Sequence, residues 1–454
     1  MEGAVLGDGN SRRKGNVLLV NPWIYDFAAH NLWIEPLGLL TIAAVLRERG
    51  YSVSVLDCLA PHPGTPAARG DGSGKFLKIE VKKPEAIAFV PRRYGRYGLP
   101  VDRFEAALAQ APPPDAVLVA SGMTYWYPGV IEAIARVRAR YRGVPVALGG
   151  VYATLCPEHA RLHSGADLVI TGPGVAAALR FVDAVTGQDS EPDRTTDPRT
   201  WPAPAHGLVA RPFAGLVTSW GCPYRCTYCA SHRLQPTFVQ RDAGAVVEEV
   251  GECAKRGILD FAFYDDALLA EGGRNLRAIL QEVMARALKV RFHTPNGMHA
   301  AGITEDLAWL MKRAGVATVR LSLETVDPIR QEITGGKVTT GAFAQAISHL
   351  HAARYGAREL GAYILAGLPD QSLAEVEETV RYVHDLGVQA KLALFSPIPG
   401  TVDGDGALEP GVDPLLHNNT VYPYLVGGEY ARDLQRVKQI AKEGNLVLLR
   451  EASA

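Results

Sequence analysis

Short apolar runs alternate with longer amphipathic segments over the first part of the chain. Residues 37–49 and 130–141 carry the 3.6-residue hydrophobic period of a helix. The apolar runs that we interpret as strands are residues 16–22, 53–56, 116–120, 146–148 and 168–170. Strands that alternate with helices of this length predict a parallel sheet covered on both faces. We therefore expect an α/β, Rossmann-like domain over residues 16–185.

Three stretches break this alternation. Residues 61–111 combine a Pro- and Gly-rich start, a basic run and the Arg-Tyr pairs of residues 93–97. A connection of this length is usually functional or disordered, and we expect the Arg-Tyr pairs to form a solvated face. Residues 1–15 are rich in Gly, Ser, Arg and Lys, which predicts a flexible tail. The polar, Pro-rich residues 186–212 are interpreted as a linker.

A second series of strands and helices follows the linker. The six expected strands are residues 215–219, 261–264, 290–293, 318–323, 362–366 and 391–395. Amphipathic segments such as residues 245–255, 276–287, 305–314 and 373–386 are the expected helices between them. Six such units predict a partial (β/α)6 TIM-type barrel over residues 213–400, with its site at the carboxyl ends of the strands. Residues 401–454 would form a C-terminal cap over part of the opening.

Composition removes several classes of protein. Of 454 residues, 47% are hydrophobic and 21% charged, which is typical of a globular protein. The net charge of −1 gives no reason to expect nucleic acid or a membrane as partner. The most apolar stretch, residues 37–46, is too short to span a bilayer, and the N-terminus lacks a secretory pattern. We expect a cytoplasmic protein.

The six cysteines are unevenly spaced. Cys58, Cys156 and Cys253 stand alone and are interpreted as small buried apolar residues. Immediately after the first barrel strand, a C-x3-C-x2-C motif contains Cys222, Cys226 and Cys229. Three thiolates on one tight loop can hold three irons of a 4Fe-4S cluster and leave the fourth iron open for a substrate or cofactor.

A zinc knuckle is the alternative interpretation of the same loop. Thiolates also suit zinc, and a closed structural zinc site takes four ligands. His232 lies three residues after Cys229 and could supply the fourth ligand. The protein would then be a non-catalytic zinc-binding module.

The motif, with Tyr228 just before its third cysteine, resembles that of the radical S-adenosylmethionine (SAM) enzymes. Together with the first domain, the chain resembles the subfamily in which a cobalamin-binding-type domain precedes the radical SAM core. The resemblance implies that Cys222, Cys226 and Cys229 ligate the cluster and that SAM occupies the open iron. It also implies a small-molecule substrate and a one-electron reductant such as flavodoxin or ferredoxin.

The resemblance places further SAM contacts at the strand ends. It assigns Asp265 and Asp266 to the methionyl amino group, and Ser322 and Glu324 to the ribose hydroxyls and the methionyl carboxylate. Gly367 would let the backbone approach the adenine, which Tyr228 would help to hold. The residues alone leave other roles open: helix capping for the aspartates, a surface ion pair for Glu324 and a simple turn at Gly367. His293 is interpreted as a core histidine with satisfied ring nitrogens.

Whether the first domain binds cobalamin is left open. The chain has no Asp-x-His-x-x-Gly segment to supply an axial ligand. Residues 172–175 read Gly-Pro-Gly-Val where the family usually has Gly-Glu-Gly-Glu. Bulky Trp126, Tyr127 and Tyr152 follow the strands and could fill the space of a corrin. We predict that this domain does not bind cobalamin tightly.

The reaction expected from the resemblance is reductive cleavage of SAM at the cluster. A SAM-derived group, 3-amino-3-carboxypropyl or methyl, would be transferred to a small-molecule acceptor in specialised metabolism. Cobalamin-dependent methyl transfer to carbon or phosphorus is the alternative within the same family.

Overall fold

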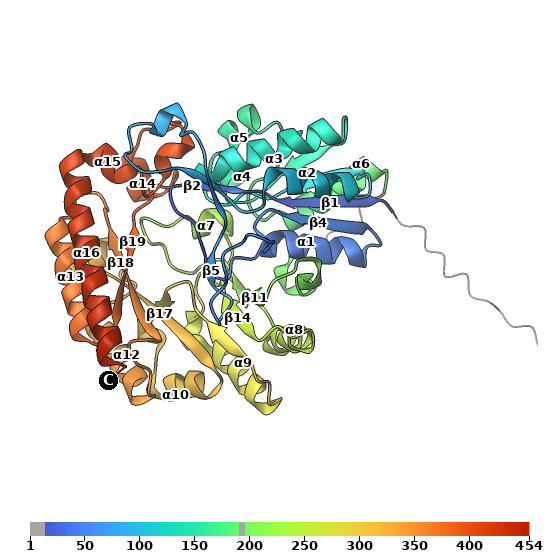
Figure 1. Ribbon diagram of the computed structural model, residues 1–454. Helices are drawn as coiled ribbons and strands as arrows, with labels where there is room; N and C mark the ends of the chain where they lie inside the picture. The colour runs from blue at the N-terminus through green and yellow to red at the C-terminus, as the bar shows by residue number, and fades with distance from the viewer. Residues whose placement is uncertain (1–13, 190–195, 454) are drawn as a thin grey trace, which may run out of the picture.

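The computed structural model describes residues 14–189 and 196–453. Residues 1–13 of the expected tail and 190–195 of the expected linker lie outside this range. Two parallel sheets lie side by side, an N-terminal domain and an open barrel (Figure 1). No helix in the described part of the chain has the length and apolarity needed to cross a bilayer.

The N-terminal sheet is the expected parallel sheet. Its strands are β1 (Asn16–Asn21), β4 (Ser52–Asp57), β8 (Ala116–Val119), β9 (Val146–Leu148) and β10 (Leu168–Val169). They pair in the order β10-β9-β8-β1-β4, so the strand order reverses between β1 and β8. In open α/β sheets, ligands bind outside the carboxyl ends of the strands, next to this switch point.

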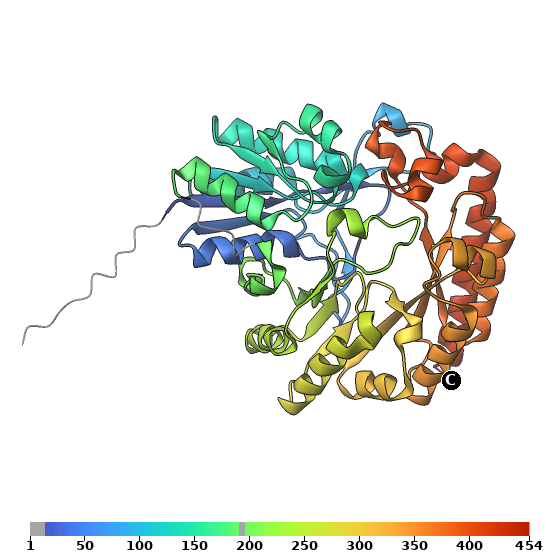
Figure 2. The same cartoon turned by 180° about the vertical axis from the view of Figure 1, so that it is seen from behind.

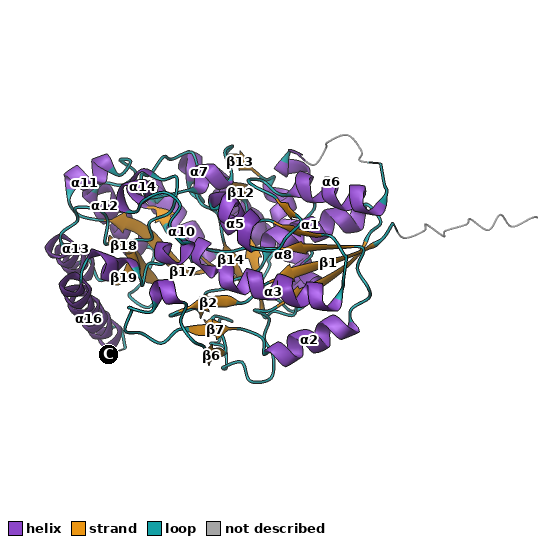
Figure 3. Ribbon diagram, turned by 90° about the horizontal axis from the view of Figure 1, so that it is seen from above, coloured by secondary structure: helices purple, strands orange, loops and turns teal. Residues whose placement is uncertain are grey.

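Helices cover both faces of the N-terminal sheet, as Figure 3 shows from above. Helices α1 (Leu37–Glu48) and α6 (Val175–Thr186) cover one face, and α2 (Val101–Gln110) and α3 (Tyr127–Arg140) cover the other. Val17 and Leu19 pack into the first core, whereas Leu18 and Val20 pack into the second. Both faces of β1 are therefore buried, which explains its unbroken apolar run.

The expectation of a long loop over residues 61–111 is wrong for much of that stretch. It contains α2, and it contributes β6 (Lys78–Glu80) and β7 (Gly95–Tyr97) to an antiparallel sheet with β2 (Ile24–Asp26). Tyr94 and Tyr97 are buried rather than solvated. Period-2 alternation is too short to detect in strands of three residues. The same stretch contributes β5 (Gly74–Lys75), which pairs with β3 (His30–Asn31).

The barrel has the expected six parallel strands in chain order. They are β11 (Phe213–Leu216), β14 (Asp260–Phe263), β15 (Arg291–His293), β17 (Val316–Glu324), β18 (Leu360–Ala366) and β19 (Gln389–Leu394). A two-residue strand, β16 (Met298–His299), also pairs with β17. β11 and β19 are the two edges of this sheet and do not pair, so the barrel is open on one side (Figure 2).

Helices surround the barrel on its outer face. They are α8 (Ala243–Lys255), α9 (Arg274–Ala285), α10 (Glu305–Arg313), α11 (Pro328–Ile333), α12 (Thr340–Ala352) and α13 (Leu373–Asp385). Asp242, Thr304 and Ser372 each cap the following helix by accepting a hydrogen bond from its third backbone N–H. The long helix α16 (Gly428–Glu451) packs on α13 and β19 at the edge of the sheet (Figure 1).

The C-terminal segment ties the two domains together. Its short helices α14 (Val402–Ala407) and α15 (Tyr422–Val426) lie near the insertion of the first domain (Figure 1). Leu415 and Val421 share a hydrophobic core with Tyr94. Asn418 donates to Asp26 over 2.9 Å, and the Tyr127 hydroxyl donates to Asp413 over 3.1 Å. This segment is the expected cap.

Candidate active site

The three clustered cysteines lie on the loop between β12 (Ser219–Trp220) and α7 (Ser231–Leu234). β12 pairs with β13 (Val239–Gln240), which anchors both ends of the loop. The Cys229 N–H donates to the Cys226 carbonyl over 3.1 Å, and this turn brings the two residues together. All three thiols are partly exposed and free. α7 lies between the two domains (Figure 1).

The chemistry of the loop fits an iron–sulfur cluster. Burial raises the pKa of the Cys222 and Cys226 thiols, and the negative charge of the neighbouring thiolates adds to this shift. A bound cationic cluster would offset that cost, because metal-bound thiols are deprotonated. The described residues contain no group of three or more His, Cys, Asp or Glu placed around a single ion. A 4Fe-4S cluster binds each thiolate to a different iron, so it does not need its ligands around a single ion.

Asp265 holds the start of the cysteine loop. Its buried carboxylate accepts hydrogen bonds from the Thr218 N–H at 3.0 Å, the Thr218 hydroxyl at 2.7 Å and the Ser219 hydroxyl at 2.7 Å. Three charge-assisted hydrogen bonds to one carboxylate make a strong anchor. The structure therefore gives the Asp265 side chain a positioning role, and its contact with SAM stays a prediction.

Asp266 faces outward beside the loop. Its side chain is exposed and hydrogen bonds with Ser231, whose hydroxyl lies 3.2 Å from the Cys229 sulfur. The Asp266 carboxylate is also close enough to Cys222 to raise the pKa of that thiol. Asp266 therefore presents its carboxylate beside the cysteine loop, where it could accept from an ammonium group as well as from Ser231.

Glu324 ends β17 in a conformation that needs an explanation. Its φ of +68° lies in the left-handed region, which few non-glycine residues occupy, and the register with β18 shifts at this point. The strain turns the carboxylate toward Lys337, whose Nζ lies 3.5 Å from Oε1. Such backbone strain is characteristic of functional sites.

Lys337 was not found from the sequence. Burial alone would lower its pKa, but Glu324 and the thiols of Cys226 and Cys229 raise it. Gly335 brings its loop onto the cysteine loop, because a Cβ there would lie 3.2 Å from the Cys226 Cα. The Gly335-Gly336 pair just before Lys337 was the available signal. A cation thus stands beside the cysteines, where it would stabilise thiolates or a carboxylate.

Ser322 lies one layer deeper in the barrel. It is buried, and Gly297 covers its hydroxyl so closely that a Cβ on Gly297 would lie 2.2 Å from Oγ. The adjacent His299 stacks on Tyr224 of the cysteine loop with ring centroids 4.4 Å apart. Burial and Lys337 lower the pKa of His299 to about 4, and its Nε2 has no partner among the described residues. An orphaned buried nitrogen at this site fits a ligand that donates to it.

The expected adenine contacts lie together. Tyr228 packs with Leu365 and Leu368, on either side of Gly367. Gly367 has a φ of +100°, and a Cβ there would lie 3.3 Å from the Tyr430 hydroxyl. That hydroxyl is buried with no partner among the described residues. Tyr430, from α16, is a further candidate that no local sequence pattern indicated.

A cavity of about 240 Å³ lies at the carboxyl ends of the N-terminal strands. Its wall is built from small residues that include Gly38, Gly149 and Gly150. Trp201 and Trp220 close the end that faces the barrel and contact each other edge to face at 5.1 Å. Trp220 belongs to β12, two residues before Cys222. The cavity therefore runs from the N-terminal sheet to the start of the cysteine loop.

The bulky aromatic residues of the first domain lie elsewhere. Tyr152 is fully buried in the core under α3 and stacks on Tyr127. Trp126 donates to Asp26 over 2.8 Å. None of the three lines the cavity at the strand ends. One of the reasons for expecting weak cobalamin binding therefore does not apply at this cavity.

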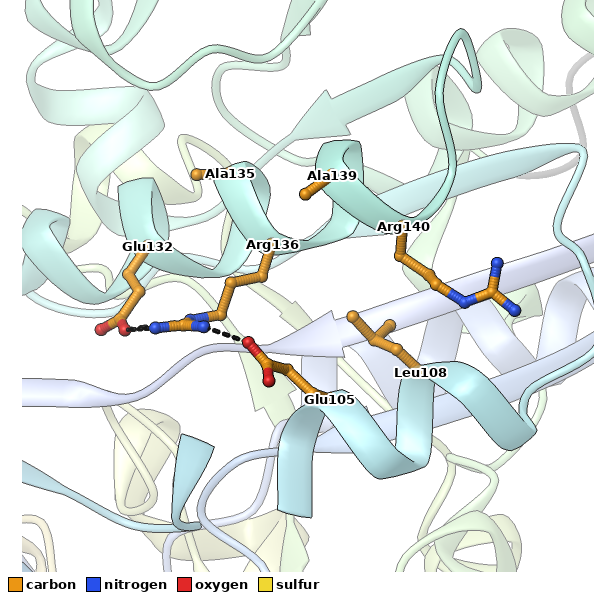
Figure 4. A pocket seen from close by; sticks show the side chains of 7 residues that line it. All are labelled: Glu105, Leu108, Glu132, Ala135, Arg136, Ala139 and Arg140. Atoms are coloured by element: carbon orange, nitrogen blue, oxygen red, sulfur yellow. Dashed lines mark hydrogen bonds and ion pairs between the residues drawn. The ribbon is translucent and has the colours of Figure 1, made fainter. Parts of the chain in front are cut away.

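A second hollow, of about 490 Å³, lies on the outer face between α2 and α3 (Figure 4). Arg136 bridges Glu132, at 2.7 Å, and Glu105 across it. Its lining is far from the cysteine loop in the fold, and we assign it no role in the chemistry.

His293 has the structural role expected of it. Its ring nitrogens lie 3.0 Å from the Thr318 hydroxyl and 3.0 Å from Asp260, and Trp33 stacks on its face. Both nitrogens are satisfied, so the interpretation as a core histidine is confirmed.

Residues 216–383, which contain the cysteine loop and most of the barrel, match the Radical SAM superfamily. The chain is therefore an enzyme with a radical SAM domain over these residues. It is 27% identical over 290 residues to an uncharacterized methyltransferase of Pyrococcus horikoshii, covering 56% of this chain and 61% of that protein's length. It is 24% identical to the cytidylyl-2-hydroxyethylphosphonate methyltransferase of Streptomyces wedmorensis, covering 87% of this enzyme and 82% of the relative.

The fold of the enzyme is shared with a solved structure. TsrM from Kitasatospora setae, a radical SAM methyltransferase with cobalamin and a 4Fe-4S cluster bound, superposes with a TM-score of 0.63 at 17% identity. The match covers 89% of this enzyme and 81% of TsrM. The enzyme thus shares with TsrM a fold in which a parallel α/β domain precedes the radical SAM core, and its superfamily uses a 4Fe-4S cluster and SAM.

Proposed function

We propose that the enzyme transfers a methyl group from SAM to a small-molecule acceptor, with cobalamin held between its two domains. The cavity that joins the N-terminal strand ends to Trp220 carries this proposal. It lies where a ligand of the first domain would meet the cysteine loop. Two of the relatives named above are methyltransferases, which supports methyl rather than another SAM-derived group.

The walls of the cavity fit one part of a cobalamin. Glycines at positions 38, 149, 172 and 174 leave room for a flat group to lie against the backbone. At about 240 Å³ the cavity takes a bicyclic base such as the nucleotide base of cobalamin, not a whole corrin. The corrin would have to lie toward the cysteine loop.

The residues of the barrel would prepare SAM for reaction. When bound, a 4Fe-4S cluster supplies electrons to the SAM sulfonium, and cobalamin supplies a carrier for the methyl group. Cys222, Cys226 and Cys229 would hold the cluster, and Asp265 fixes the loop on which they stand.

The groups around the loop would bind SAM itself. Asp266 is placed to accept from the methionyl ammonium, and Lys337 to donate to the methionyl carboxylate. Tyr228 and the unpaired Tyr430 hydroxyl beside Gly367 would enclose the adenine and exclude water. Hydrogen bonds to charged groups each contribute about 1.5–3 kcal/mol.

Transfer of a 3-amino-3-carboxypropyl group remains the second candidate. It is favoured by residues 172–175, which lack both acidic residues of the family pattern, and by the missing axial histidine segment. An enzyme whose first domain had lost cobalamin would retain the cluster and SAM. The first domain would then serve as a scaffold.

One experiment separates the candidates. The full chain is reconstituted anaerobically and incubated with SAM, a one-electron reductant such as flavodoxin, and acceptor candidates, with and without hydroxocobalamin. S-adenosylhomocysteine that forms only with hydroxocobalamin supports methyl transfer. 5′-Methylthioadenosine formed without it supports the second candidate and overturns the first. A colourless protein that leaves SAM intact would instead point to zinc.

A further inference from the structure

The interior of the barrel carries cations on its last three long strands. On β17 and β18, Val319, Leu321, Ala362 and Ile364 pack outward into the core beneath the helices. Side chains alternate between the two faces of a strand, so Arg320 and Tyr363 face the interior. Lys391 pairs in register with Tyr363 and faces the same side. All three are only partly buried.

A glycine makes room for the arginine. Gly361 pairs in register with Arg320, and a Cβ on Gly361 would lie 3.1 Å from the Arg320 Cδ and 3.2 Å from Nη1. Any other residue would push the guanidinium away. Arg320 therefore lies across β18 in the direction of β19, the strand that carries Lys391.

Neither cation has an acidic partner within ion-pair distance among the described residues. Arg320 donates only to the Val319 and Glu359 carbonyls, at 3.1 and 2.9 Å. Lys391 donates to the Gln389 side chain at 2.9 Å. Most of the guanidinium and ammonium N–H groups are left available for another acceptor.

A third cation, Arg69 of the first domain, is close enough to Lys391 to act on its pKa, and its guanidinium donates to the Ser73 hydroxyl over 3.2 Å. Burial, Arg320 and Arg69 lower the pKa of Lys391 to about 8. Asp71 is close enough to Arg320 to raise the pKa of its guanidinium, but hydrogen bonds from Ser73 engage the Asp71 carboxylate. Unpaired like charges in a partly buried place are unfavourable unless an anion joins them.

We propose that Arg320 and Lys391, assisted by Arg69, bind an anionic group of the acceptor substrate. The proposal rests on the proposed function, because it places the acceptor in the same barrel as SAM. The anion is a phosphate, a phosphonate or a carboxylate. Arg320 precedes Glu324 by four residues on β17, and Glu324 is at the end of the strand near the cysteine loop. The anionic group would therefore lie about 13 Å from that end, measured along the strand. In the acceptor, the distance between the reacting atom and the anionic group should be comparable.

The test reads the modification of Lys391 and needs no turnover. The reconstituted full-length enzyme with SAM is treated with a trace of acetic anhydride, and acetylation of Lys391 and Lys312 is measured by mass spectrometry. Methylphosphonate, inorganic phosphate and acetate are the probes, and acetamide is the neutral match of acetate. Lys312 is the control because it already pairs with Glu359 on the outer face.

We expect at least one anion to protect Lys391 several-fold and acetamide to give no protection. Stronger protection by methylphosphonate indicates a phosphonate or phosphate acceptor, and stronger protection by acetate indicates a carboxylate. Arg320→Gln should raise the half-protecting concentration about tenfold, the usual effect of losing a charge-assisted hydrogen bond. Arg274→Gln, on an exposed arginine paired with Glu271, should not.

Three results would overturn the proposal: no protection by any anion, equal protection by acetamide, or unchanged protection in Arg320→Gln. Arg320→Lys retains the positive charge and should lose much less of the protection of Lys391. This variant is the control for a folding defect in Arg320→Gln. Protection of Lys391 is measured without turnover. A failed methyl-transfer assay would therefore not contradict anion binding, and a lack of protection would not contradict methyl transfer.

Discussion

The two parallel sheets of the enzyme meet at the carboxyl ends of their strands, but the residues at those ends differ in kind. The N-terminal strands end in a cavity of glycines and apolar side chains. At the ends of the barrel strands lie thiols, the strained Glu324, the half-buried Lys337 and polar atoms that lack partners among the described residues. The first end selects a ligand by shape, whereas the second holds charge in place for a reaction.

This contrast shows how one topology serves two roles. Parallel sheets gather their loops at one edge, so both domains offer a ligand site there. Recognition of a ligand by its shape needs space, which glycines leave open. A chemical reaction instead needs polar groups that are kept out of water at a cost in free energy. Trp220 stands at the boundary, since it closes the cavity and begins the cysteine loop. Substitutions on either side of it should separate the two roles.

The largest effect should come from the cysteine loop. Cys222→Ala, Cys226→Ala and Cys229→Ala should each lose most of the roughly four irons bound per chain, because each thiolate is expected to hold one iron. SAM cleavage should disappear with the iron. Cys253→Ala is the matched control, since Cys253 is buried on α8 away from the loop. Iron content and SAM cleavage are measured after anaerobic reconstitution, and wild-type cleavage in any loop variant would contradict the assignment.

Filling the cavity should affect only the N-terminal side. Gly38 on α1 lines the cavity, and a Cβ there would meet no atom within 4 Å. Gly38→Phe should therefore fold and reduce the retention of hydroxocobalamin more than tenfold while the iron content stays normal. Gly251→Phe, in equally open space on α8, is the control. Equilibrium dialysis gives the answer, and wild-type retention in Gly38→Phe would place cobalamin elsewhere. Wild-type enzyme that retains none would instead confirm the sequence-based prediction of weak binding.

A smaller effect is expected for the groups that are predicted to contact SAM. Glu324→Gln, Ser322→Ala and Lys337→Met should each weaken SAM binding about tenfold, through loss of about 1.5 kcal/mol. Lys312→Gln removes a lysine from the outer face of the barrel and should leave the affinity unchanged. Calorimetric titration with SAM reports the dissociation constant. An unchanged constant with a lower melting temperature would show that these side chains are structural.

An effect on stability, and not on ligand binding, is expected at the joint between the two regions. His206 lies 3.0 Å from both Glu35 of the first domain and Glu249 of the barrel, and all three are buried. Although burial opposes it, the two carboxylates raise the pKa of His206 from 6.5 to about 9. Protonated His206 therefore stabilises the fold fully below pH 6.5, and this contribution of about 3 kcal/mol is lost as the pH rises through about 9.

The stability of the joint can be followed by urea unfolding between pH 6 and pH 10. The midpoint of the wild type should fall across this range. His206→Gln should start lower and show a flatter profile, whereas His349→Gln, whose ring contacts only the Ile303 carbonyl, should follow the wild type. A wild-type slope in His206→Gln would show that another group governs the pH dependence.

The fold was largely accessible from the sequence because its signals are local. Apolar runs buried on both faces and capped amphipathic helices identified the strands and helices of both sheets. The insertion was not accessible, because Tyr94 is buried by residues such as Leu415 that lie more than 300 positions away, and Tyr97 packs against Ile24 of another strand. No local pattern contains such a contact.

The site divides in the same way. The cysteine motif occupies eight consecutive residues and was evident. Lys337 and His299 reach the loop from separate elements, and Tyr430 reaches Gly367 from α16. The engagement of Asp265 by Thr218 and Ser219 could not be inferred either, because its neighbours in sequence do not reveal which strand end it faces. A lysine after two glycines is a weak signal until the fold shows what the glycines touch.

The stacking of Trp33 on His293 also has a consequence for biosynthesis. The two rings are 4.1 Å apart in space but 260 positions apart in the chain. At a synthesis rate of about 5–20 residues per second, the tryptophan leaves the ribosome roughly 13–50 s before its partner. During that interval the nascent first domain exposes the face of Trp33 that packs on His293 in the folded enzyme. A chaperone that holds this segment would therefore favour correct assembly of the two domains.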